Sequence, residues 1–339
     1  MKAAYYTGNR SFELREGNAL APAKGEVRLE VAFCGVCGTD MHVFHGSMDK
    51  RVAPPKIIGH EASGVVAEVG EGVTGFKVGD KVAVRPLNFG APHPFDRGVE
   101  YVGKNMKFIG LDVQGAFQSS WTVPAYALHR LPDNFDLKYG AMIEPLAVGC
   151  HDVSIGSVKA GEHCVVLGGG PIGILIAFVL RERGARALVS EINDDRLKML
   201  ESFGFETVNP ARENIIEKVS SFTGEAMADV VFEVSGSAAA AGIMTEIVCV
   251  QGRIVMVAVH GEPKKVNLHR FFWSEIRMFG ARLYEAADFD EAIKIAATGR
   301  IPFEQLITRI QPLEKIQELF EEIDRHPAGM KSLVDCRTL

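Results

Sequence analysis

The stretch CGVCGTDMH, residues 34–42, combines thiol, hydroxyl, carboxyl and imidazole side chains within one short segment. A Cys-x-x-Cys pair serves in many proteins as a zinc clip or as a redox pair. A zinc ribbon needs a second pair, and a redox pair needs a thioredoxin-like strand and helix; the sequence offers neither. Cys34 belongs to an alternating strand pattern, so we interpret it as a small buried residue. Cys37 follows in a glycine-flanked turn and is the candidate metal ligand.

Two later stretches add the other ligand types that zinc favours. GHE places His60 beside Glu61, and EPLAVG contains Glu144. Thiolate, imidazole and carboxylate groups bind zinc, and three such ligands with one open position form a catalytic site. The predicted chemistry of such a site is Lewis-acid activation, in which zinc lowers the pKa of a bound hydroxyl group.

A glycine motif in CVVLGGGPIG predicts a dinucleotide site. Gly168, Gly170 and Gly173 follow a buried strand, and a helix opens at Pro171 and Ile172. The first glycine permits a tight turn, the second lets the backbone approach a pyrophosphate, and the third lets the helix pack closely on the strand. The N-terminus of the helix would then face the anion.

Glu191 ends the next predicted strand, where an acid binds the ribose hydroxyls of a dinucleotide. A carboxylate there repels the extra phosphate of NADP, so the predicted cofactor is NAD. Arg196 would lie over the adenine or meet a phosphate, and with Glu191 present we favour the adenine. Val257 and Arg282, near the ends of the last two predicted strands, complete the predicted cofactor contacts.

The elements that position these residues differ along the chain. Before Ala160, short valine-rich stretches alternate with glycine and aspartate turns, which predicts a β-rich barrel or sandwich. From there to Arg282, strands and helices alternate, with helices predicted over 171–184 and 237–250. Such alternation builds an open parallel sheet covered by helices. Amphipathic helices in the tail are expected to pack on the β-rich part.

Size and composition argue against several classes of protein. A chain of 339 residues predicts two domains, and a net charge of −6 without a Lys/Arg-rich run argues against nucleic acid or an anionic membrane as partner. The longest apolar run, 172–180, is too short to span a bilayer, and the first residues lack the apolar core of a secretory signal. Six scattered cysteines suit a reducing compartment, so we predict a cytoplasmic protein.

Over essentially its whole length, the chain resembles the zinc-dependent medium-chain dehydrogenases of the alcohol dehydrogenase superfamily. The resemblance is carried by CGVCGTDMH, GHEASGVVAEVGEGV, VGDKV, EPLAVG and VVLGGGPIG. It implies an α/β protein with a GroES-like β-rich catalytic domain, residues 1–148 and 284–339. A Rossmann domain with a doubly wound parallel sheet, residues 149–283, would bind NAD. Glu144 followed by proline resembles the sorbitol (polyol) and threonine dehydrogenase branch.

The resemblance also implies a ligand set. Zinc would be held by Cys37 and His60, with Glu61 and Glu144 as alternative or exchanging carboxylate ligands. Which carboxylate binds directly stays open at the level of the sequence. Asp40 would steer the imidazole of His60, although a carboxylate at this spacing also caps turns.

A proton path is implied by the same stretch. The hydroxyl of Thr39 is suited to accept the proton of the substrate hydroxyl, and an imidazole at His42 can pass it to solvent near neutral pH. A turn hydroxyl bonded to the backbone is the alternative for Thr39, and an exposed loop histidine is the alternative for His42.

One stretch departs from the family pattern. Most bacterial relatives hold a structural zinc with four cysteines in a lobe after the first strands, and the corresponding residues 86–110 contain no cysteine. We therefore predict one catalytic zinc per chain and no structural zinc. The family also implies a homo-oligomer, a tetramer or a dimer, formed partly through the sheet edge at 252–259 and 276–282.

The polar ligand Glu144 favours a hydroxyl-rich substrate over a simple alkyl alcohol. Our first expectation is a sugar alcohol oxidised to a ketose, with Arg282 placed to meet a hydroxyl cluster or a carboxylate. A sugar acid oxidised at a secondary hydroxyl is the nearest alternative, followed by L-threonine. Two other classes are a zinc-free quinone or enone reductase and a non-catalytic NAD-binding protein; metal content separates them from a zinc enzyme.

Overall fold

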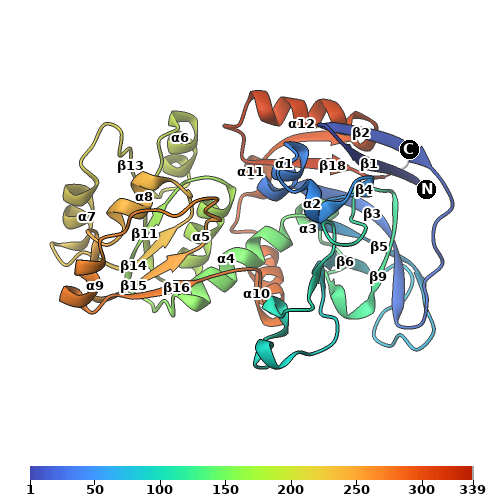
Figure 1. The fold of residues 1–339 in the computed structure, drawn as a ribbon, viewed down its shortest axis with the longest axis horizontal. Coiled ribbons are helices and arrows are strands. Elements are labelled where there is room, and N and C mark those ends of the chain that lie inside the picture. The colour runs from blue at the N-terminus through green and yellow to red at the C-terminus, as the bar shows by residue number, and fades with distance from the viewer. Residues whose placement is uncertain (338–339) are drawn as a thin grey trace. The chain divides into compact units, whose positions relative to one another are not determined.

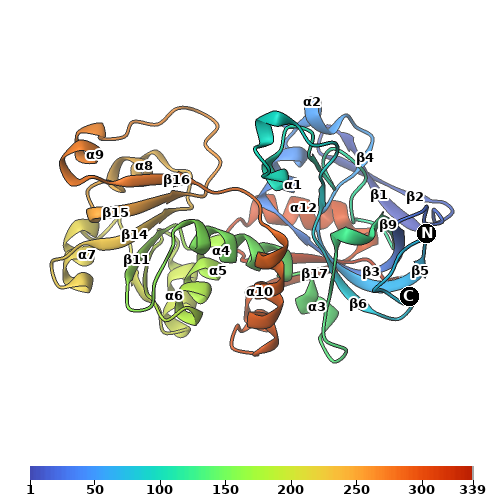
Figure 2. The ribbon, with the colours of Figure 1, turned by 90° about the horizontal axis from the view of Figure 1, so that it is seen from below.

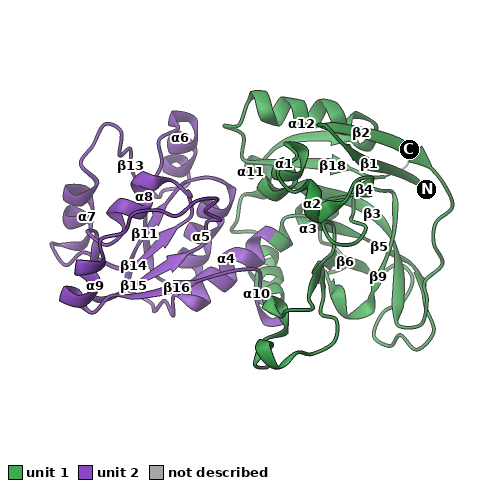
Figure 3. Cartoon of the chain, viewed as in Figure 1, with its two compact units in different colours: residues 1–144, 289–339 green, residues 145–288 purple. Residues whose placement is uncertain are grey.

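The computed structural model describes residues 1–337 and divides the chain into two compact units (Figure 3). Unit 1 comprises Met1–Glu144 and Phe289–Leu339, and unit 2 comprises Pro145–Asp288. The domain boundaries expected from the sequence, after residues 148 and 283, lie within a few residues of these limits. A single continuous segment therefore forms unit 2, inserted into the chain of unit 1.

Unit 1 is built on a seven-stranded sheet with the order β10-β6-β5-β3-β18-β17, in which β9 also pairs with β3. Its strands are β3 Glu26–Val36, β5 Glu61–Val69, β6 Lys81–Val84, β9 Ser120–Pro124, β10 Leu128–Arg130, β17 Ile307–Pro312 and β18 Lys331–Asp335. Smaller sheets pair β1 Lys2–Gly8 with β2 Ser11–Glu16 on one side and with β4 Lys56–Ile57 on the other, and pair β7 Leu87–Asn88 with β8 Lys107–Phe108. The central strand β3 is buried along most of its length because it pairs on both sides.

Short helices surround these sheets. They are α1 Gly38–Phe44, α2 Asp49–Val52, α3 Leu137–Gly140, α11 Phe303–Leu306 and α12 Ile316–Arg325, with 3-10 turns η1 Pro94–Asp96, η2 Glu100–Val102, η3 Ala125–Ala127 and η4 Leu313–Lys315. As expected for the tail, α12 packs on this β-rich unit, where it contacts α1, β2, β17 and β18. The ring of Phe320 lies 5.3 Å from that of Phe44 and 5.8 Å from that of Phe117, so these aromatic residues form core.

Unit 2 contains a six-stranded parallel sheet with the order β13-β12-β11-β14-β15-β16. Its strands are β11 His163–Leu167, β12 Arg186–Ser190, β13 Glu206–Val208, β14 Ala228–Glu233, β15 Val248–Met256 and β16 Arg277–Gly280. The helices are α5 Pro171–Glu182, α6 Asp194–Ser202, α7 Ile215–Thr223, α8 Ala238–Ile243 and α9 Leu268–Ser274, while α4 Ile143–Ile155 and α10 Ala286–Ala297 cross the unit boundaries. Helices cover both faces of the sheet (Figures 1 and 2), which confirms the doubly wound fold.

One predicted helix is wrong. The sequence suggested a helix over 237–250, but α8 ends at Ile243 and residues 248–250 begin β15. The alanine run favours a helix locally, whereas Val248 pairs with Ala228 of β14 and is buried in the sheet core. The helix N-terminus itself is well defined, because the hydroxyl of Ser237 accepts a hydrogen bond from the Ala240 amide.

The cysteine-free lobe is held by ordinary polar caps. The carboxylate of Asp96 accepts hydrogen bonds from the amides of His93, at 3.0 Å, and Lys104, at 2.7 Å. The Nδ1 atom of His93 accepts a hydrogen bond from the Phe95 amide at 3.1 Å. These side chains bind the lobe's own backbone.

None of the helices between residues 1 and 337 combines the length and apolar character that a membrane span requires.

A buried carboxyl in α4 gives a stability prediction for unit 2. Asp152 is almost fully buried, and Oδ2 finds no hydrogen-bond partner among the described residues. Burial, reinforced by the nearby Asp288 carboxylate, raises the pKa of Asp152 well above its usual value. Asp288 itself is paired with the imidazole of His151 at 2.8 Å. Ionisation of Asp152 therefore opposes folding.

We expect Asp152→Asn to stabilise the protein at pH 8 on the order of 1–3 kcal/mol, with a smaller gain at pH 5. The sign follows because a carboxyl whose pKa is raised by folding contributes stability only at low pH, and that contribution is lost as the pH rises above about 4. Urea unfolding at the two pH values measures the difference. Asp133→Asn, at an exposed position, is the control; an equal gain for both variants would contradict the prediction.

Candidate active site

Cys37 is placed by the junction between β3 and α1. It is the N-cap of α1: its Sγ accepts the amide of Thr39 at 3.5 Å, and its own amide donates to Oδ2 of Asp40 at 2.9 Å. This reciprocal capping box fixes the turn that carries the thiol. Asp40 therefore caps the turn, which is one of the two roles considered for it from the sequence. Its other carboxylate oxygen, Oδ1, takes no part in this cap.

His60 and Glu61 reach the same place through strand pairing. Glu61 begins β5, which runs antiparallel to β3, and it lies opposite Gly35, two residues before Cys37. One ligand atom each from Cys37, His60 and Glu61 lies within 4.8 Å of the others, which is the spacing of a metal-binding set. His60 and Glu61 are 2% and 1% exposed, so the donors converge in the interior of unit 1.

Unpaired buried atoms show that these donors fit a metal ion. Within residues 1–337, Oε2 of Glu61, Nδ1 of His60 and Oδ1 of Asp40 are buried without a hydrogen-bond partner. Nδ1 of His60 lies 3.6 Å from Oδ1 of Asp40, too far for a hydrogen bond but close enough for Asp40 to orient the ring. The ring of Phe108 packs edge-on against the imidazole at 4.9 Å. A thiol, an imidazole and a carboxylate in this setting match zinc.

Two features that the sequence did not reveal hold the Glu61 carboxylate in place. The ammonium of Lys331, at the start of β18, forms an ion pair with Oε1 of Glu61, and both side chains are buried. A side chain at Gly35 would place its Cβ 2.0 Å from Oε2 of Glu61, so only glycine leaves space for the carboxylate. Lys331 and Gly35 therefore fix the carboxylate with one oxygen paired and the other free.

The charges of the cluster act strongly on one another. Burial opposes the charged form of His60, but the carboxylate of Asp40 and contact with Cys37 raise its pKa to about 10. Burial likewise opposes the charged form of Lys331, and Glu61 and Cys37 raise its pKa above the usual value. Burial raises the pKa of Asp40. The pKa values of His60 and Lys331 rise because acidic side chains and the Cys37 thiol surround them. A metal ion would be bound by the deprotonated forms of the ligand side chains.

The remaining predicted residues of this region lie around the cluster rather than in it. Glu144, in the first turn of α4, is 6% exposed, and its charge acts on His60 and Lys331, but it does not belong to the three-residue metal set. Thr39 is half-buried beside Cys37, and His42 is exposed on α1. The geometry therefore favours Glu61 over Glu144 as the third ligand.

The glycine motif in unit 2 has the geometry of a dinucleotide cradle. Gly168 has a φ of +116°, which a residue with a side chain rarely adopts, and a Cβ at Gly173 would lie 1.8 Å from the Gly168 carbonyl oxygen. A Cβ at Gly170 would meet only Nη1 of Arg196, at 3.6 Å, within the described part of the chain. Gly170 is the N-cap of α5, and no side chain of residues 1–337 caps this helix. The open face over Gly170 fits a pyrophosphate.

Comparison with known proteins decides the family. Residues 23–133 match the family description "Alcohol dehydrogenase GroES-like domain", and residues 171–298 match "Zinc-binding dehydrogenase". Together these matches cover well over half of the chain. The chain belongs to the zinc-binding alcohol dehydrogenase family. The resemblance, the GroES-like plus Rossmann fold and the enzyme class predicted from the sequence are confirmed for this dehydrogenase.

Three similar proteins place this dehydrogenase within its family. The 2-dehydro-3-deoxy-L-galactonate 5-dehydrogenase of Pseudoalteromonas atlantica is 52% identical over 99% of both chains. The sorbitol dehydrogenase of Halalkalibacterium halodurans is 31% identical, covering 95% of this chain and 96% of the relative. A zinc-binding dehydrogenase structure from Sinorhizobium meliloti, bound to NADP, superimposes with a TM-score of 0.91 at 27% identity over 98% of both chains. Zinc and a nicotinamide dinucleotide are thus the cofactors of this dehydrogenase.

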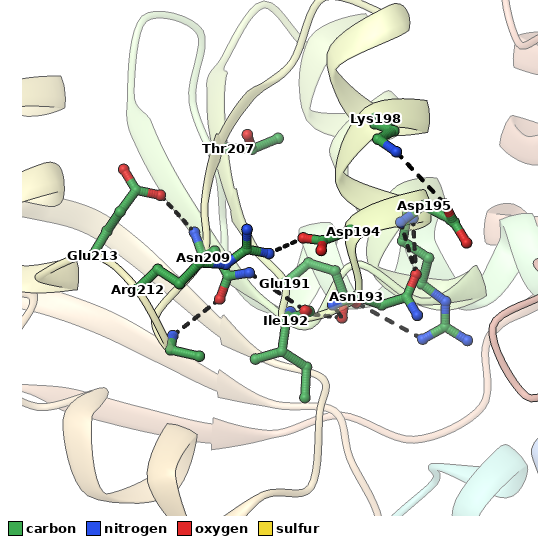
Figure 4. Close-up of polar contacts among 12 residues, drawn as sticks. Glu191, Ile192, Asn193, Asp194, Asp195, Lys198, Thr207, Asn209, Arg212 and Glu213 are labelled. Carbon is green, nitrogen blue, oxygen red and sulfur yellow. Dashed lines mark hydrogen bonds and ion pairs between the residues drawn. The ribbon is translucent and has the colours of Figure 1, made fainter.

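The two residues predicted to bind the adenosine part of the cofactor follow β12 in the chain. Glu191 follows β12 (Figure 4) and is 7% exposed, and Nη1 of Arg196 lies 3.8 Å from its Oε2. At the other end of the site, Val257 is half-buried just after β15, and its amide donates to the Glu233 carbonyl at 2.9 Å. Arg282 is exposed after β16. The structure thus places the predicted cofactor residues at the carboxyl edge of the sheet or just after its strands.

This dehydrogenase has a further pair, a buried acid and a half-buried histidine, that sequence reasoning missed. Glu233, fully buried at the end of β14, lies 2.9 Å from Nε2 of His260 and also accepts the amides of Ser235 and Gly236. The pair fixes the loops that follow β14 and β15 at the edge of the sheet where parallel α/β folds bind ligands. An acidic residue at the end of a predicted strand could have indicated Glu233, but its histidine partner is too distant in the sequence to be recognised.

Proposed function

We propose that this dehydrogenase oxidises a secondary hydroxyl of a sugar acid, at carbon 5 of 2-dehydro-3-deoxy-L-galactonate or a close analogue, with NAD as hydride acceptor. The observation that carries the proposal is 52% identity, across both chains in full, to an enzyme with that name. The polyol dehydrogenases are more distant, at about 31% for the sorbitol enzyme. The comparisons thus favour the sugar-acid alternative over the sugar alcohol that we expected first.

In this proposal Cys37, His60 and Glu61 hold zinc, which would act as a Lewis acid on the substrate hydroxyl. Lys331 and Gly35 keep the Glu61 carboxylate in place, and Asp40 orients His60. Thr39 would accept the hydroxyl proton while it passes its own proton on, and the exposed imidazole of His42 would release that proton to solvent. Glu144 adds negative charge beside the cluster without ligating the metal.

The dinucleotide is bound by unit 2 in the same proposal. The open face of Gly170 and the N-terminus of α5 receive the pyrophosphate, and Glu191 binds the ribose hydroxyls. Val257 and Arg282 contact the cofactor further along the edge. Because a carboxylate repels a 2′-phosphate, NAD is the preferred cofactor.

A substrate panel tests the proposal. Reduction of NAD+ and NADP+ is followed at the absorbance band of the reduced nicotinamide with 2-dehydro-3-deoxy-L-galactonate, sorbitol, xylitol, L-threonine and 2,3-butanediol. We expect the highest kcat/KM with the sugar acid and NAD+. A higher kcat/KM with the polyols would support the sorbitol-like alternative, and no turnover with any alcohol by zinc-loaded protein would contradict both.

The proposal includes a homo-oligomer, a dimer or a tetramer, formed through the free edge of the sheet in unit 2. All four residues of the edge strand β16 are exposed, with exposed fractions of 48% for Met278 and 38% for Phe279. Nearby in the sequence, Phe272 and Trp273 of α9 are also largely exposed. An exposed apolar edge strand readily pairs with another chain, and a second copy carries the same edge.

We expect Phe279→Glu to convert the oligomer of the wild-type protein to smaller species, because the charge would be buried against its copy. Light scattering coupled to size-exclusion chromatography measures the mass. Val78→Glu is the matched control, since Val78 is 65% exposed on unit 1. A monomeric wild-type protein, or an unchanged mass for Phe279→Glu, would show that this edge is not the interface.

None of the six cysteines, all within the described residues, forms a disulfide; two of them are half-buried and four are buried. Free thiols are typical of proteins that stay in a reducing compartment. We therefore place this dehydrogenase in the cytoplasm as part of the proposal.

A further inference from the structure

An ion pair in unit 1 joins helix α2 to the turn that follows β8. Nε of Arg51 donates to Oδ1 of Asp112 and Nη2 of Arg51 donates to Oδ2, each at 2.8 Å. Two hydrogen bonds between one guanidinium and one carboxylate fix the relative orientation of the two groups. The side chains are 40% and 22% exposed, and an ion pair at the surface stabilises a fold only slightly through charge alone. The importance of the pair therefore lies in the geometry that it imposes.

Asp112 fixes the backbone of Phe108. Oδ2 of Asp112 accepts the Phe108 amide at 2.7 Å, and the Asp112 amide donates to the Phe108 carbonyl at 2.9 Å. The ring of Phe108 packs edge-on against the imidazole of His60, with ring centroids 4.9 Å apart and an interplanar angle of 70°. Both residues are almost fully buried. A chain of direct contacts therefore runs from Arg51 through Asp112 and Phe108 to the imidazole of the metal cluster.

The segment after Phe108 lies tightly against the backbone of Gly59 and His60. A Cβ at Gly110 would lie 2.4 Å from the Gly59 carbonyl oxygen and 3.2 Å from Cβ of His60. A Cβ at Gly115 would lie 2.4 Å from the same carbonyl oxygen, and the Ala116 amide donates to it at 2.9 Å. Glycine permits this close approach of two backbones. A shift of this segment would therefore be passed on to His60.

The helix that supplies Arg51 is itself anchored. The hydroxyl of Tyr6, a fully buried residue of β1, donates to Oδ1 of Asp49 in α2 at 3.0 Å. Nζ of Lys56 donates to the Asp112 carbonyl at 3.3 Å, which adds a second link from the same part of the chain to the turn. The guanidinium of Arg51 therefore reaches Asp112 from a fixed helix.

The His60 ring depends on such packing for its orientation. Nδ1 of His60 has no hydrogen-bond partner among residues 1–337, and Oδ1 of Asp40 lies 3.6 Å away, so Asp40 acts on the ring through charge. Partners that orient a metal-ligating imidazole raise the affinity of the site for its metal. The edge of the Phe108 ring is such a support.

We propose that Arg51 and Asp112 are positioning residues of the metal site, which hold Phe108 against His60 and so keep the imidazole oriented for zinc. The inference rests on the zinc site of the proposed function. Arg51 and Asp112 do not touch the metal in this role and act only through Phe108. The cysteine-free lobe, residues 86–110, ends at this turn, so the same pair fixes the end of the lobe beside the metal cluster.

Zinc affinity tests the inference without turnover. Chelator-treated wild-type protein, Arg51→Met and Asp112→Asn are titrated with Zn2+ in competition with a chromophoric chelator. We expect the Kd for Zn2+ to rise about tenfold in both variants, which is about 1.4 kcal/mol of binding free energy. Asp112→Asn keeps the size of the side chain and an acceptor for the Phe108 amide, and it serves if Arg51→Met folds poorly. Arg51→Lys keeps the positive charge and should recover part of the affinity.

Two further readouts distinguish positioning from a general loss of stability. The absorption bands of bound Co2+ should shift in Arg51→Met, because they report the geometry of the ligands. The Kd for NAD+, measured by calorimetry, should stay unchanged, because the proposed dinucleotide site lies in unit 2. A purely structural role would lower the melting temperature of the metal-free protein and leave the Kd for Zn2+ as it is in the wild type.

A double-mutant cycle tests the path through Phe108. Phe108→Leu removes the ring edge, so adding Arg51→Met in this background should raise the Kd for Zn2+ little further. The matched control is Arg28→Met, which breaks a half-exposed pair between β3 and β5, where Nε of Arg28 lies 3.1 Å from Oε2 of Glu68. Glu68 lies near the opposite end of β5 from Glu61, and the Kd for Zn2+ should not change.

The outcomes separate this inference from the proposed function. Wild-type protein that binds no Zn2+ would overturn the proposed metal site and this inference with it. Wild-type protein that binds Zn2+, with an unchanged Kd in Arg51→Met and Asp112→Asn, would overturn the positioning role alone. That role is also overturned if Arg28→Met raises the Kd equally, or if Arg51→Met has its full effect in the Phe108→Leu background.

Discussion

Cys37→Ala should abolish zinc binding and lower kcat/KM by about a thousandfold or more, because a three-ligand site that loses its thiolate keeps only His60 and the Glu61 carboxylate. Metal analysis should find about one zinc per chain in wild-type protein and close to none in the variant. The fold should survive, since Cys37 is half-buried and its main structural role is a weak amide contact at 3.5 Å.

Cys249→Ala is the matched control for this loss. Cys249 is also half-buried, but it lies in β15 of unit 2, outside the metal set. It should keep both zinc and activity. Treatment with a chelator followed by added zinc should restore wild-type protein but not Cys37→Ala. If Cys37→Ala retains one zinc and full turnover, the ligand set drawn from Cys37, His60 and Glu61 is wrong.

The conformation of the glycine turn was predictable from the sequence because its determinants are local. Gly168, Gly170 and Gly173 lie within one strand–turn–helix unit, and the positive φ of Gly168 and the close approach at Gly173 follow from that spacing. The prediction of a helix over 237–250 was wrong because the end of that segment depends on residues distant in the sequence. Residues 248–250 join β15 because β14 offers them a partner, and sheet pairing depends on residues far away in the sequence.

The choice between the two carboxylates could not be made from the sequence for the same physical reason. In the structure the Glu61 carboxylate is held by Gly35, which lies opposite it on β3, and by Lys331, 270 residues further along the chain. Both contacts exist only after β3, β5 and β18 have assembled into one sheet. A lysine near the end of the chain gives no local sign that it will be 3% exposed.

The buried pair of Lys331 and Glu61 gives the second large expected effect. We expect Lys331→Met to destabilise metal-free protein by about 3–5 kcal/mol, because it leaves the Glu61 carboxylate buried without its cation. Lys331→Arg keeps the charge and should recover part of the loss. Calorimetric unfolding of chelator-treated protein measures these changes.

Two further measurements, one in a Glu61→Gln background and one with added zinc, distinguish loss of the ion pair from loss of packing. In the Glu61→Gln background the carboxylate that Lys331 pairs with is absent, so Lys331→Met should cost much less than it does in wild-type protein. Zinc should also raise the melting temperature of Lys331→Met more than that of wild-type protein, because the metal supplies the cation that Glu61 has lost. Equal costs in both backgrounds, together with an unchanged response to zinc, would mean that Lys331 stabilises unit 1 by packing and does not position the Glu61 carboxylate.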